Sequence, residues 1–452
     1  VLNGGSGNDT LIGGAGADVL VGDIGTDTAS YSTATLAVIA SLIAAGSNTG
    51  DAAGDSYSGI ENLTGGAGAD TLTGDAGANA LDGGAGNDVL IGGAGADALN
   101  GNTGTDTASY IAAAAGLTAS LVTPASNTGD AAGDTYAGIE NLTGSNFADT
   151  LIAGSGVNAL DGGGGDDILV GGSGADAVTG GAGIDTASYS TSTAAVGANL
   201  TTPASNSGDA AGDTYSGIEN LTGGSAADTL TGNASANTLD GGSGNDTLVG
   251  GGGGDTLNGN AGIDTASYAG AAALMLDRII AANSTGDAAG DAFVNIEKFL
   301  LTANNDQFVG NGDNETIDGG AGNDTINAGS GDDFVFGGAG KDIMTGGAGI
   351  DIFDFNATTE SVVGANADSI LDFLQGADRI DLSTIDAKTT TSGDQAFSFI
   401  GASAFSNVAG QLRATVSGGV TTILGDVNGD GVADFQIILE TGVTLTSGDF
   451  FL

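Results

Sequence analysis

The sequence predicts an all-β solenoid, in which short parallel strands stack in successive coils, with regularly spaced insertions and a C-terminal β cap. Three observations carry this prediction. Glycine contributes 87 of the 452 residues. A glycine-rich motif of nine residues recurs in phase along most of the chain. These motifs are contained in a longer repeat, and repeats that can bury their apolar side chains only against their neighbours are typical of solenoids.

The nine-residue motif reads Gly-Gly-x-Gly-x-Asp-x-U-x, where U is a large apolar residue. Residues 83–91 (GGAGNDVLI) are a clear copy, and five consecutive copies fill residues 65–109. Glycine at three of the first six positions permits positive φ and close backbone approach, so this part should form a tight turn. The last three residues should form a short strand with U facing inward. Two copies then make one coil of eighteen residues, and stacked coils give two parallel sheets.

The longer repeat, which we call the module, is marked by Asp-Thr-Ala-Ser-Tyr. This marker begins at Asp27, Asp106, Asp185 and Asp264, so its copies are equally spaced. Each module contains six nine-residue units, one of them with Glu in the Asp position, and one insertion. The insertions are expected near residues 31–55, 110–134, 189–213 and 268–291.

The composition changes after residue 355. Glycine becomes rarer, Phe and Ile become more frequent, and alternating stretches such as residues 397–400 (FSFI) indicate half-buried strands. We therefore predict two domains, a repeat solenoid over residues 1–355 and a C-terminal cap over residues 356–452. Because the sequence opens inside a repeat, we expect it to be part of a longer protein.

The charge of the chain is extreme. Fifty-six acidic residues against 6 basic ones give a net charge of −50, and no Lys or Arg precedes Arg278. Nucleic acids and anionic membranes are bound mainly through Lys and Arg, so neither is an expected partner. The absence of His and Cys excludes imidazole catalysis, thiolate nucleophiles and disulfides. The longest apolar run, near residues 36–45, is too short to span a membrane, and no signal peptide is visible.

The aspartates at position six of the motif are the candidate metal ligands. Aspartates eighteen residues apart, such as Asp70 and Asp88, should lie one coil apart on the same edge. Two such charges about 5 Å apart repel by roughly 3 kcal/mol at an effective dielectric constant of about 20. Ca²⁺ takes about six to eight carboxylate and carbonyl oxygens, so we predict that several Ca²⁺ ions at these edges switch on folding. The predicted ligands are Asp9, Asp18, Asp27, Asp70, Asp88, Asp97, Asp106, Asp149, Asp167, Asp176, Asp185, Asp228, Asp246, Asp255, Asp264, Asp306, Asp324, Asp333, Asp342 and Asp351.

The opposite edge of each module carries a row with an interruption. The first row is Glu61–Asn79–Asp97, and Asn158 and Asn237 take the place of Asn79 in the next two modules. Asn offers only a neutral oxygen, so weaker or vacant sites are expected there. The fourth row, Glu297–Glu315–Asp333, has no Asn.

Two further acidic patterns leave alternatives open. Asp426, Asn428, Asp430 and Asp434 match positions 1, 3, 5 and 9 of an EF-hand loop, but position 12 is Ile437, so a structural turn and a calcium site are both compatible. The Asp51/Asp55 type of pair in each insertion contributes either extra ligands or a polar turn.

A tyrosine ends each block of motifs, at Tyr31, Tyr110, Tyr189 and Tyr268. The inward residue before each is Ala, which leaves room in the core. We predict that these tyrosines are packing plugs.

These motifs resemble the RTX (repeat-in-toxin) calcium-binding proteins over nearly the whole chain. The resemblance implies a parallel β-roll, folding triggered by calcium, and export by type I secretion. Residues 378–383 (DRIDLS) and 426–435 (DVNGDGVADF) resemble the cap that follows the β-roll in serralysin-type proteases. The final DFFL resembles the ending of uncleaved secretion signals. No His-Glu-x-x-His motif occurs, so protease activity is not implied, and the insertions depart from the simplest members of the family.

The predicted function is that of a secreted, non-enzymatic calcium-binding protein of the extracellular space or cell surface, such as a scaffold, an adhesin or a surface-layer component. The alternative is the C-terminal secretion and folding module of a secreted hydrolase, a protease or lipase, whose catalytic domain lies outside this sequence. The expected partners are calcium, the type I secretion apparatus, and either another copy of the chain or a cell-surface component. No catalytic or organic cofactor-binding residue is predicted.

Overall fold

Residues 1–452 are described by a computed structural model, which consists of β-strands and short 3₁₀ helices without an α-helix. Most strands have three residues, and the central side chain points inward. In β8 (Thr71–Thr73) and β10 (Val89–Ile91), the central Leu72 and Leu90 are fully buried and lie opposite each other in parallel register. Paired residues are eighteen positions apart, so one coil contains two nine-residue units. The prediction of an all-β parallel roll is confirmed.

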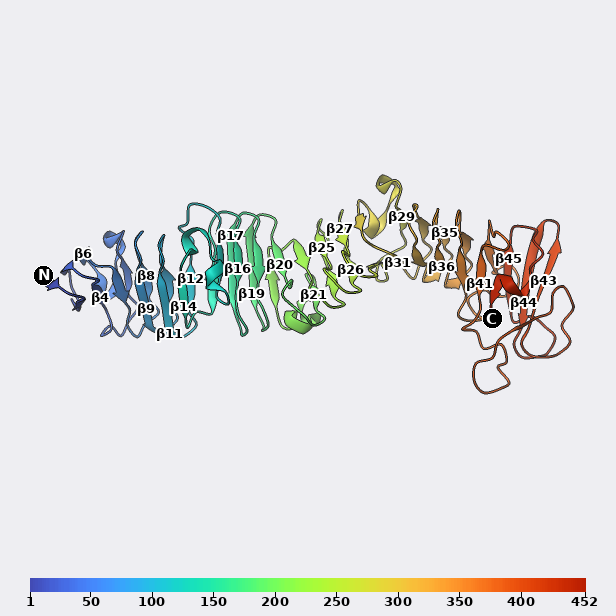
Figure 1. Ribbon diagram of the computed structural model, residues 1–452, viewed down its shortest axis with the longest axis horizontal. Helices are drawn as coiled ribbons and strands as arrows, with labels where there is room; N and C mark the ends of the chain where they lie inside the picture. The colour runs from blue at the N-terminus through green and yellow to red at the C-terminus, as the bar shows by residue number, and fades with distance from the viewer. The chain divides into compact units, whose positions relative to one another are not determined.

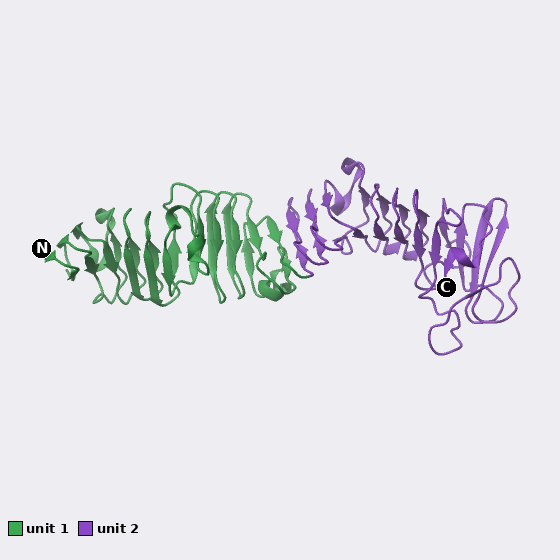
Figure 2. Cartoon of the chain, viewed as in Figure 1, with its two compact units in different colours: residues 1–226 green, residues 227–452 purple.

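The chain forms two compact units, Val1–Ala226 and Ala227–Leu452, which Figure 2 distinguishes by colour. Within each unit the short strands follow one another like rungs (Figure 1). The first unit contains a parallel sheet of β5 (Ile39–Ser41), β8, β10, β12 (Thr107–Ser109), β15 (Asn141–Thr143), β17 (Ala159–Gly164), β19 (Ala177–Ala182) and β22 (Thr214–Ser216). A second sheet contains β2 (Thr10–Leu11), β4 (Thr28–Ser30), β7 (Asn62–Thr64), β9 (Ala80–Ala85), β11 (Ala98–Thr103) and β14 (Thr135–Ala137). The remaining strands are β1 (Leu2–Ser6), β3 (Val19–Ile24), β6 (Ser56–Ser58), β13 (Thr118–Ser120), β16 (Thr150–Ile152), β18 (Ile168–Val170), β20 (Thr186–Ser188), β21 (Gly197–Asn199) and β23 (Asn220–Thr222).

The second unit continues the same pattern. One ladder contains β24 (Thr229–Thr231), β26 (Thr247–Val249), β28 (Thr265–Ser267), β31 (Lys298–Leu300), β33 (Thr316–Asp318), β36 (Phe334–Phe336), β39 (Ile352–Asp354), β41 (Arg379–Asp381) and β46 (Phe450–Phe451). A second contains β29 (Met275–Asp277), β32 (Gln307–Val309), β35 (Thr325–Asn327), β38 (Ile343–Thr345), β40 (Asp368–Ile370), β45 (Phe435–Leu439), β44 (Val420–Asp426), β43 (Gln411–Ser417) and β42 (Ser398–Phe399). A third ladder of this unit contains β25 (Thr238–Asp240), β27 (Thr256–Asn258) and β30 (Ala292–Val294), and β34 (Ala321–Gly322) and β37 (Ala339–Gly340) form a two-stranded sheet.

The insertions extend the roll without interrupting it. Across the second insertion, Ala108 of β12 pairs with Leu142 of β15, so the ladder continues although the whole insertion lies between the partners in sequence. The insertion supplies its own strand, β13, which pairs with β16 and starts a new ladder. Each insertion also forms two short 3₁₀ helices, and one more lies near the C-terminus: η1 (Ala45–Ser47), η2 (Gly50–Ala52), η3 (Pro124–Ser126), η4 (Gly129–Ala131), η5 (Pro203–Ser205), η6 (Gly208–Ala210), η7 (Ala281–Asn283), η8 (Gly286–Ala288) and η9 (Ser447–Asp449).

The parallel ladder continues past the last glycine-rich motif into the C-terminal region. Strand β39 pairs with β41, which in turn pairs with β46. Strands β43, β44 and β45 then form an antiparallel meander whose buried residues include Ile423, Ile437 and Leu439. This β structure fits the predicted cap, while the division at residue 355 stays a prediction. No helix of the chain has the length and hydrophobicity needed to cross a membrane.

Candidate metal-binding edges

The position-six aspartates form continuous rows along the edges of the coils. The backbone N–H of Asp70 donates to Asp88 Oδ1 at 2.8 Å, and the N–H of Asp88 donates to Asp106 Oδ1 at 2.7 Å. The sequence therefore predicted correctly which aspartates lie on the same edge. The same contact joins Asp9/Asp27, Asp149/Asp167, Asp167/Asp185, Asp228/Asp246, Asp246/Asp264, Asp306/Asp324, Asp324/Asp342 and Asp333/Asp351.

The second oxygen of most of these carboxylates is buried and has no hydrogen-bond donor. A buried ionised oxygen without a partner is strongly unfavourable, and the chain has no basic residue before Arg278 that could neutralise it. The folded rows therefore require either a bound cation or protonation of the carboxyls. Among the predicted ligands, the unpartnered Oδ2 atoms belong to Asp9, Asp27, Asp88, Asp97, Asp106, Asp167, Asp176, Asp185, Asp246, Asp255, Asp264, Asp324, Asp333, Asp342 and Asp351.

The first glycine of each motif leaves a space beside this oxygen. A Cβ at Gly319 would lie 2.8 Å from Asp324 Oδ2 and 2.5 Å from the carbonyl oxygen of Gly337, one coil further on. At Gly162 the corresponding neighbours are Asp167 Oδ2 and the carbonyl oxygen of Gly180. Carboxylate and carbonyl oxygens of two coils thus face the same small space, and this mixture of oxygens suits Ca²⁺.

The pKa values of the row carboxyls show that their ionised form is unfavourable when no cation is bound. Burial, assisted by the neighbouring carboxylates, raises the pKa of Asp324 to about 7. Burial likewise raises the pKa to about 6 for Asp88, Asp97, Asp167, Asp176, Asp246, Asp255, Asp342 and Asp351.

Some of the predicted ligands differ from the others because both of their carboxylate oxygens accept hydrogen bonds. Asp70 Oδ2 accepts the N–H of Gly66 at 2.5 Å, and its Oδ1 accepts the N–H of Val38 from the insertion at 2.7 Å. Asp149 and Asp306 are bonded in the same way, so in these three residues both oxygens have a donor: Oδ1 ties the insertion to the coil after it, and Oδ2 closes the turn of its own motif. Their role as calcium ligands stays a prediction. Asp18 is only half-buried, and its N–H donates to Asp55 Oδ1 at 2.7 Å.

Of each pair of insertion acids left open by the sequence, the Asp55 member accepts a tyrosine hydroxyl. Besides its bond from Asp18, Asp55 accepts the hydroxyl of Tyr31 on Oδ2 at 2.9 Å. Tyr31 is buried, as predicted for a plug, and also contacts the hydroxyl of Tyr57 at 2.5 Å. The nearly constant sequence spacing between each tyrosine and its aspartate was a signal for this contact that the sequence reasoning missed. The equivalent pairs are Tyr110/Asp134, Tyr189/Asp213 and Tyr268/Asp291.

The loop that resembles an EF-hand is closed by its own backbone. Asp426 accepts the N–H of Gly429 on Oδ1 at 2.6 Å and that of Gly431 on Oδ2 at 2.9 Å. Asp434 Oδ2 accepts the N–H of Val427 at 2.7 Å. These bonds favour the structural-turn alternative.

Two row members after the last motif were missed by the sequence reasoning. The N–H of Asp342 donates to Asp368 Oδ1 at 2.8 Å, and the N–H of Asp351 donates to Asp378 Oδ1 at 3.1 Å. Asp368 Oδ2 is unpartnered, and burial raises the pKa of Asp368 to about 8. Both pairs are spaced more widely than eighteen positions, which hides Asp368 and Asp378 from a search based on that period. No group of three or more acidic side chains is placed to hold one metal ion, so backbone carbonyls must complete any ligand set.

Comparisons with known proteins agree with this geometry. The family described as "RTX calcium-binding nonapeptide repeat (4 copies)" matches residues 1–29, 55–90, 73–108, 134–169, 153–187, 213–248 and 232–266. The family described as "Peptidase M10 serralysin C terminal" matches residues 284–452. No curated protein sequence matches the chain.

Similar solved structures include two subunits of the Azotobacter vinelandii mannuronan C5-epimerase. The AlgE6R3 subunit is 26% identical, and the match covers 33% of this chain and 78% of that subunit with a TM-score of 0.25. The AlgE6R2 subunit is 24% identical, with 33% and 88% of the two chains covered and a TM-score of 0.25.

Proposed function

Because the chain belongs to the RTX calcium-binding repeat proteins and ends in a serralysin-type domain, we propose that it is a secreted structural protein that folds when it binds Ca²⁺. The observation that carries this proposal is the set of rows of buried, unpartnered Asp Oδ2 atoms in a chain with a net charge of −50. At neutral pH the ionised carboxylates within each row repel one another and keep the chain unfolded. Ca²⁺ supplies the positive charge that the chain lacks.

The residues of each row have distinct tasks. Asp Oδ2 and the carbonyl oxygen of the next coil are the proposed ligands of Ca²⁺, and the first glycine of the motif keeps the space between them open. Asp Oδ1 holds the backbone N–H of the preceding coil and so fixes the spacing of the rungs. Metal binding to a site that exists only in the folded state contributes its free energy to folding.

Export follows from the same chemistry. Where calcium is scarce the chain stays extended and can pass a type I secretion channel. Extracellular calcium-binding modules typically have dissociation constants of about 10⁻⁴–10⁻³ M, and at calcium concentrations in this range the exported chain then folds. We propose a scaffold, adhesin or surface-layer role, with no catalytic function of its own, because export and folding need fewer repeats than this chain carries. Its partners would then be calcium, the secretion apparatus, and either further copies of the chain or a cell-surface component.

A second candidate function is favoured by the match to a peptidase C-terminal family. In that case the chain would be the secretion and folding region of a hydrolase. The sequence of the full-length secreted protein distinguishes the two: further copies of the module support the scaffold, and a His-Glu-x-x-His or Gly-x-Ser-x-Gly motif supports the hydrolase.

Folding by calcium is tested by far-UV circular dichroism of the full chain at pH 7.5. We expect a disordered spectrum in chelator, a β spectrum in millimolar CaCl₂, and little change with the same concentration of MgCl₂, since Mg²⁺ sheds its water reluctantly. A full β spectrum in chelator would contradict the proposal.

A further inference from the structure

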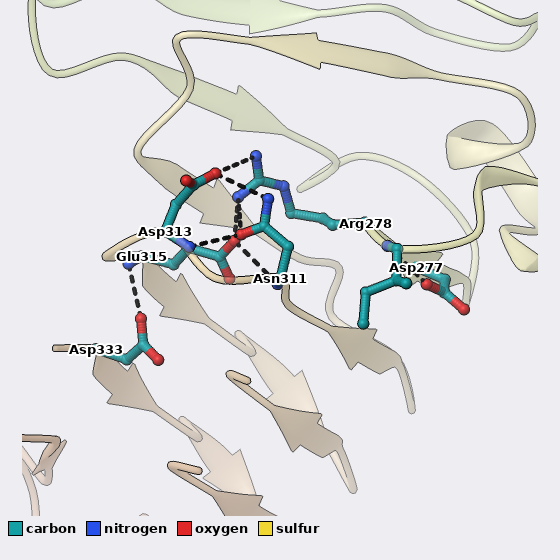
Figure 3. Close-up of polar contacts among 7 residues, drawn as sticks. Asp277, Arg278, Asn311, Asp313, Glu315 and Asp333 are labelled. Atoms are coloured by element: carbon teal, nitrogen blue, oxygen red, sulfur yellow. Dashed lines mark hydrogen bonds and ion pairs between the residues drawn. The ribbon is translucent and has the colours of Figure 1, made fainter. Parts of the chain in front are cut away.

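The fourth insertion contains the first basic residue of the chain, Arg278. Only 7% of its side chain is exposed. Its Nη1 atom donates to Glu315 Oε1, and its Nη2 atom lies 3.5 Å from Asp313 Oδ2 (Figure 3). The guanidinium carbon lies 4.7 Å from the centre of the Phe299 ring, which is within the range of a cation–π contact. A buried arginine thus neutralises Glu315, whose side chain has no exposed surface.

The other three modules have uncharged residues at the two positions that form this ion pair. The N–H of Arg278 bonds to the strand of the next coil as the N–H of Leu121 does, so the two residues hold the same backbone position. Glu315 occupies the place in its row that Asn237 occupies in the row of the preceding module. The residues in the Arg278 position of the earlier modules are Leu42, Leu121 and Leu200, and those in the Glu315 position are Asn79, Asn158 and Asn237.

Cavities of similar volume lie beside the neutral pair of the second module and the charged pair of the fourth. Leu121, Glu140 and Asn158 help to line a cavity of about 350 Å³ in the second module. Arg278 and Glu297 help to line a cavity of about 350 Å³ in the fourth.

The row around Glu315 has the geometry of the calcium-binding rows. The N–H of Glu315 donates to Asp333 Oδ1 at 2.8 Å. Glu315 Oε2 is buried without a donor, and it faces the carbonyl oxygen of Ala328 across the space beside Gly310. The feature that sets this row apart is the guanidinium on Oε1, a permanent positive charge that repels a second cation at the same carboxylate.

We propose that Arg278 is a built-in counter-ion that keeps Ca²⁺ away from Glu315. The row position held by Asn in the first three modules and by Glu315 in the fourth then binds no calcium in any of the four modules. Asn removes the negative charge in three modules, and Arg278 neutralises it in the fourth. The proposal rests on the proposed calcium-dependent folding, because it concerns which row positions take the metal.

Counting bound calcium tests the proposal. Native mass spectrometry of the full chain in CaCl₂ should give the same number of ions for the wild type and for E315N. R278L introduces the leucine of the other modules and leaves the Glu315 carboxylate without its positive partner. This variant should bind one additional calcium ion. The double variant R278L/E315N, which restores the neutral pair, should return to the wild-type number. An unchanged count in folded R278L, or one ion fewer in E315N, would overturn the proposal.

The second module offers a matched test that does not depend on the folding of R278L. N158E should bind one additional calcium ion, and L121R/N158E should return to the wild-type count. The same count in N158E and L121R/N158E contradicts the inference about Arg278. A wild-type chain that binds no calcium at all contradicts instead the proposed function, so the two failures are distinct.

Discussion

Acidification is expected to replace calcium as the trigger of folding. Burial raises the pKa of row carboxyls such as Asp88 and Asp167 from 3.8 to about 6 in the folded chain. The unfolded chain keeps the lower value, so the folded state binds more protons between these two pH values. The resulting stabilisation is fully present below about pH 4 and is lost as the pH rises through about 6. In chelator, the chain should therefore gain β structure as the pH falls from 7.5 to 4.

The measurement is a pH titration in chelator, followed by circular dichroism at low protein concentration. Sedimentation velocity of the same samples separates folding from association, which becomes easier as the net charge falls. In saturating CaCl₂ the chain should be folded at both ends of this range. A chelated chain that remains as disordered at pH 4 as at pH 7.5 would show that carboxylate charge is not what opposes folding.

A single methyl group at Gly319 is expected to remove a calcium site. The added Cβ would approach the carbonyl oxygen of Gly337 and Asp324 Oδ2, so it fills the space between the two oxygens. Overpacking of this kind costs about 1–3 kcal/mol in itself, and the lost ion adds to it. Gly319→Ala should therefore bind one calcium ion fewer and unfold at a lower urea concentration in saturating calcium.

Gly312→Ala is the matched control. Gly312 lies in the same compact unit of the chain as Gly319 and has an ordinary φ, and a Cβ there would have no neighbour within 4 Å. This substitution should be neutral or stabilise the chain by up to about 1 kcal/mol, because it restricts the unfolded state. Equal calcium counts and equal urea midpoints for the two variants would show that the space beside Gly319 does not hold the metal.

The periodic features of the structure were predictable from the sequence because they depend only on spacing. A period of nine with one large apolar residue predicts that Leu72 lies opposite Leu90 and Asp70 beside Asp88, as the structure shows. The motif likewise predicts that its second glycine adopts a positive φ, and Gly320 has a φ of +85°.

The exceptions could not be predicted because they depend on where the insertions and the C-terminal region return to the roll. Asp70 looks like every other member of its row, yet its oxygens hold Val38 and Gly66, and only the path of the first insertion brings Val38 there. Asp368 joins a row from outside the repeat, at a spacing that the C-terminal region sets. The pairing of Arg278 with Glu315 joins two segments far apart in the sequence and likewise requires the fold.

The most direct test of calcium-dependent folding is to locate the metal. Crystals grown with CaCl₂, measured at a wavelength where calcium scatters anomalously, should show ions along the aspartate rows. Each ion should lie between Asp Oδ2 and the carbonyl oxygens of successive coils, and none should lie at Glu315. Ordered coils whose aspartate rows carry no ion would contradict the claim that calcium holds the coils together.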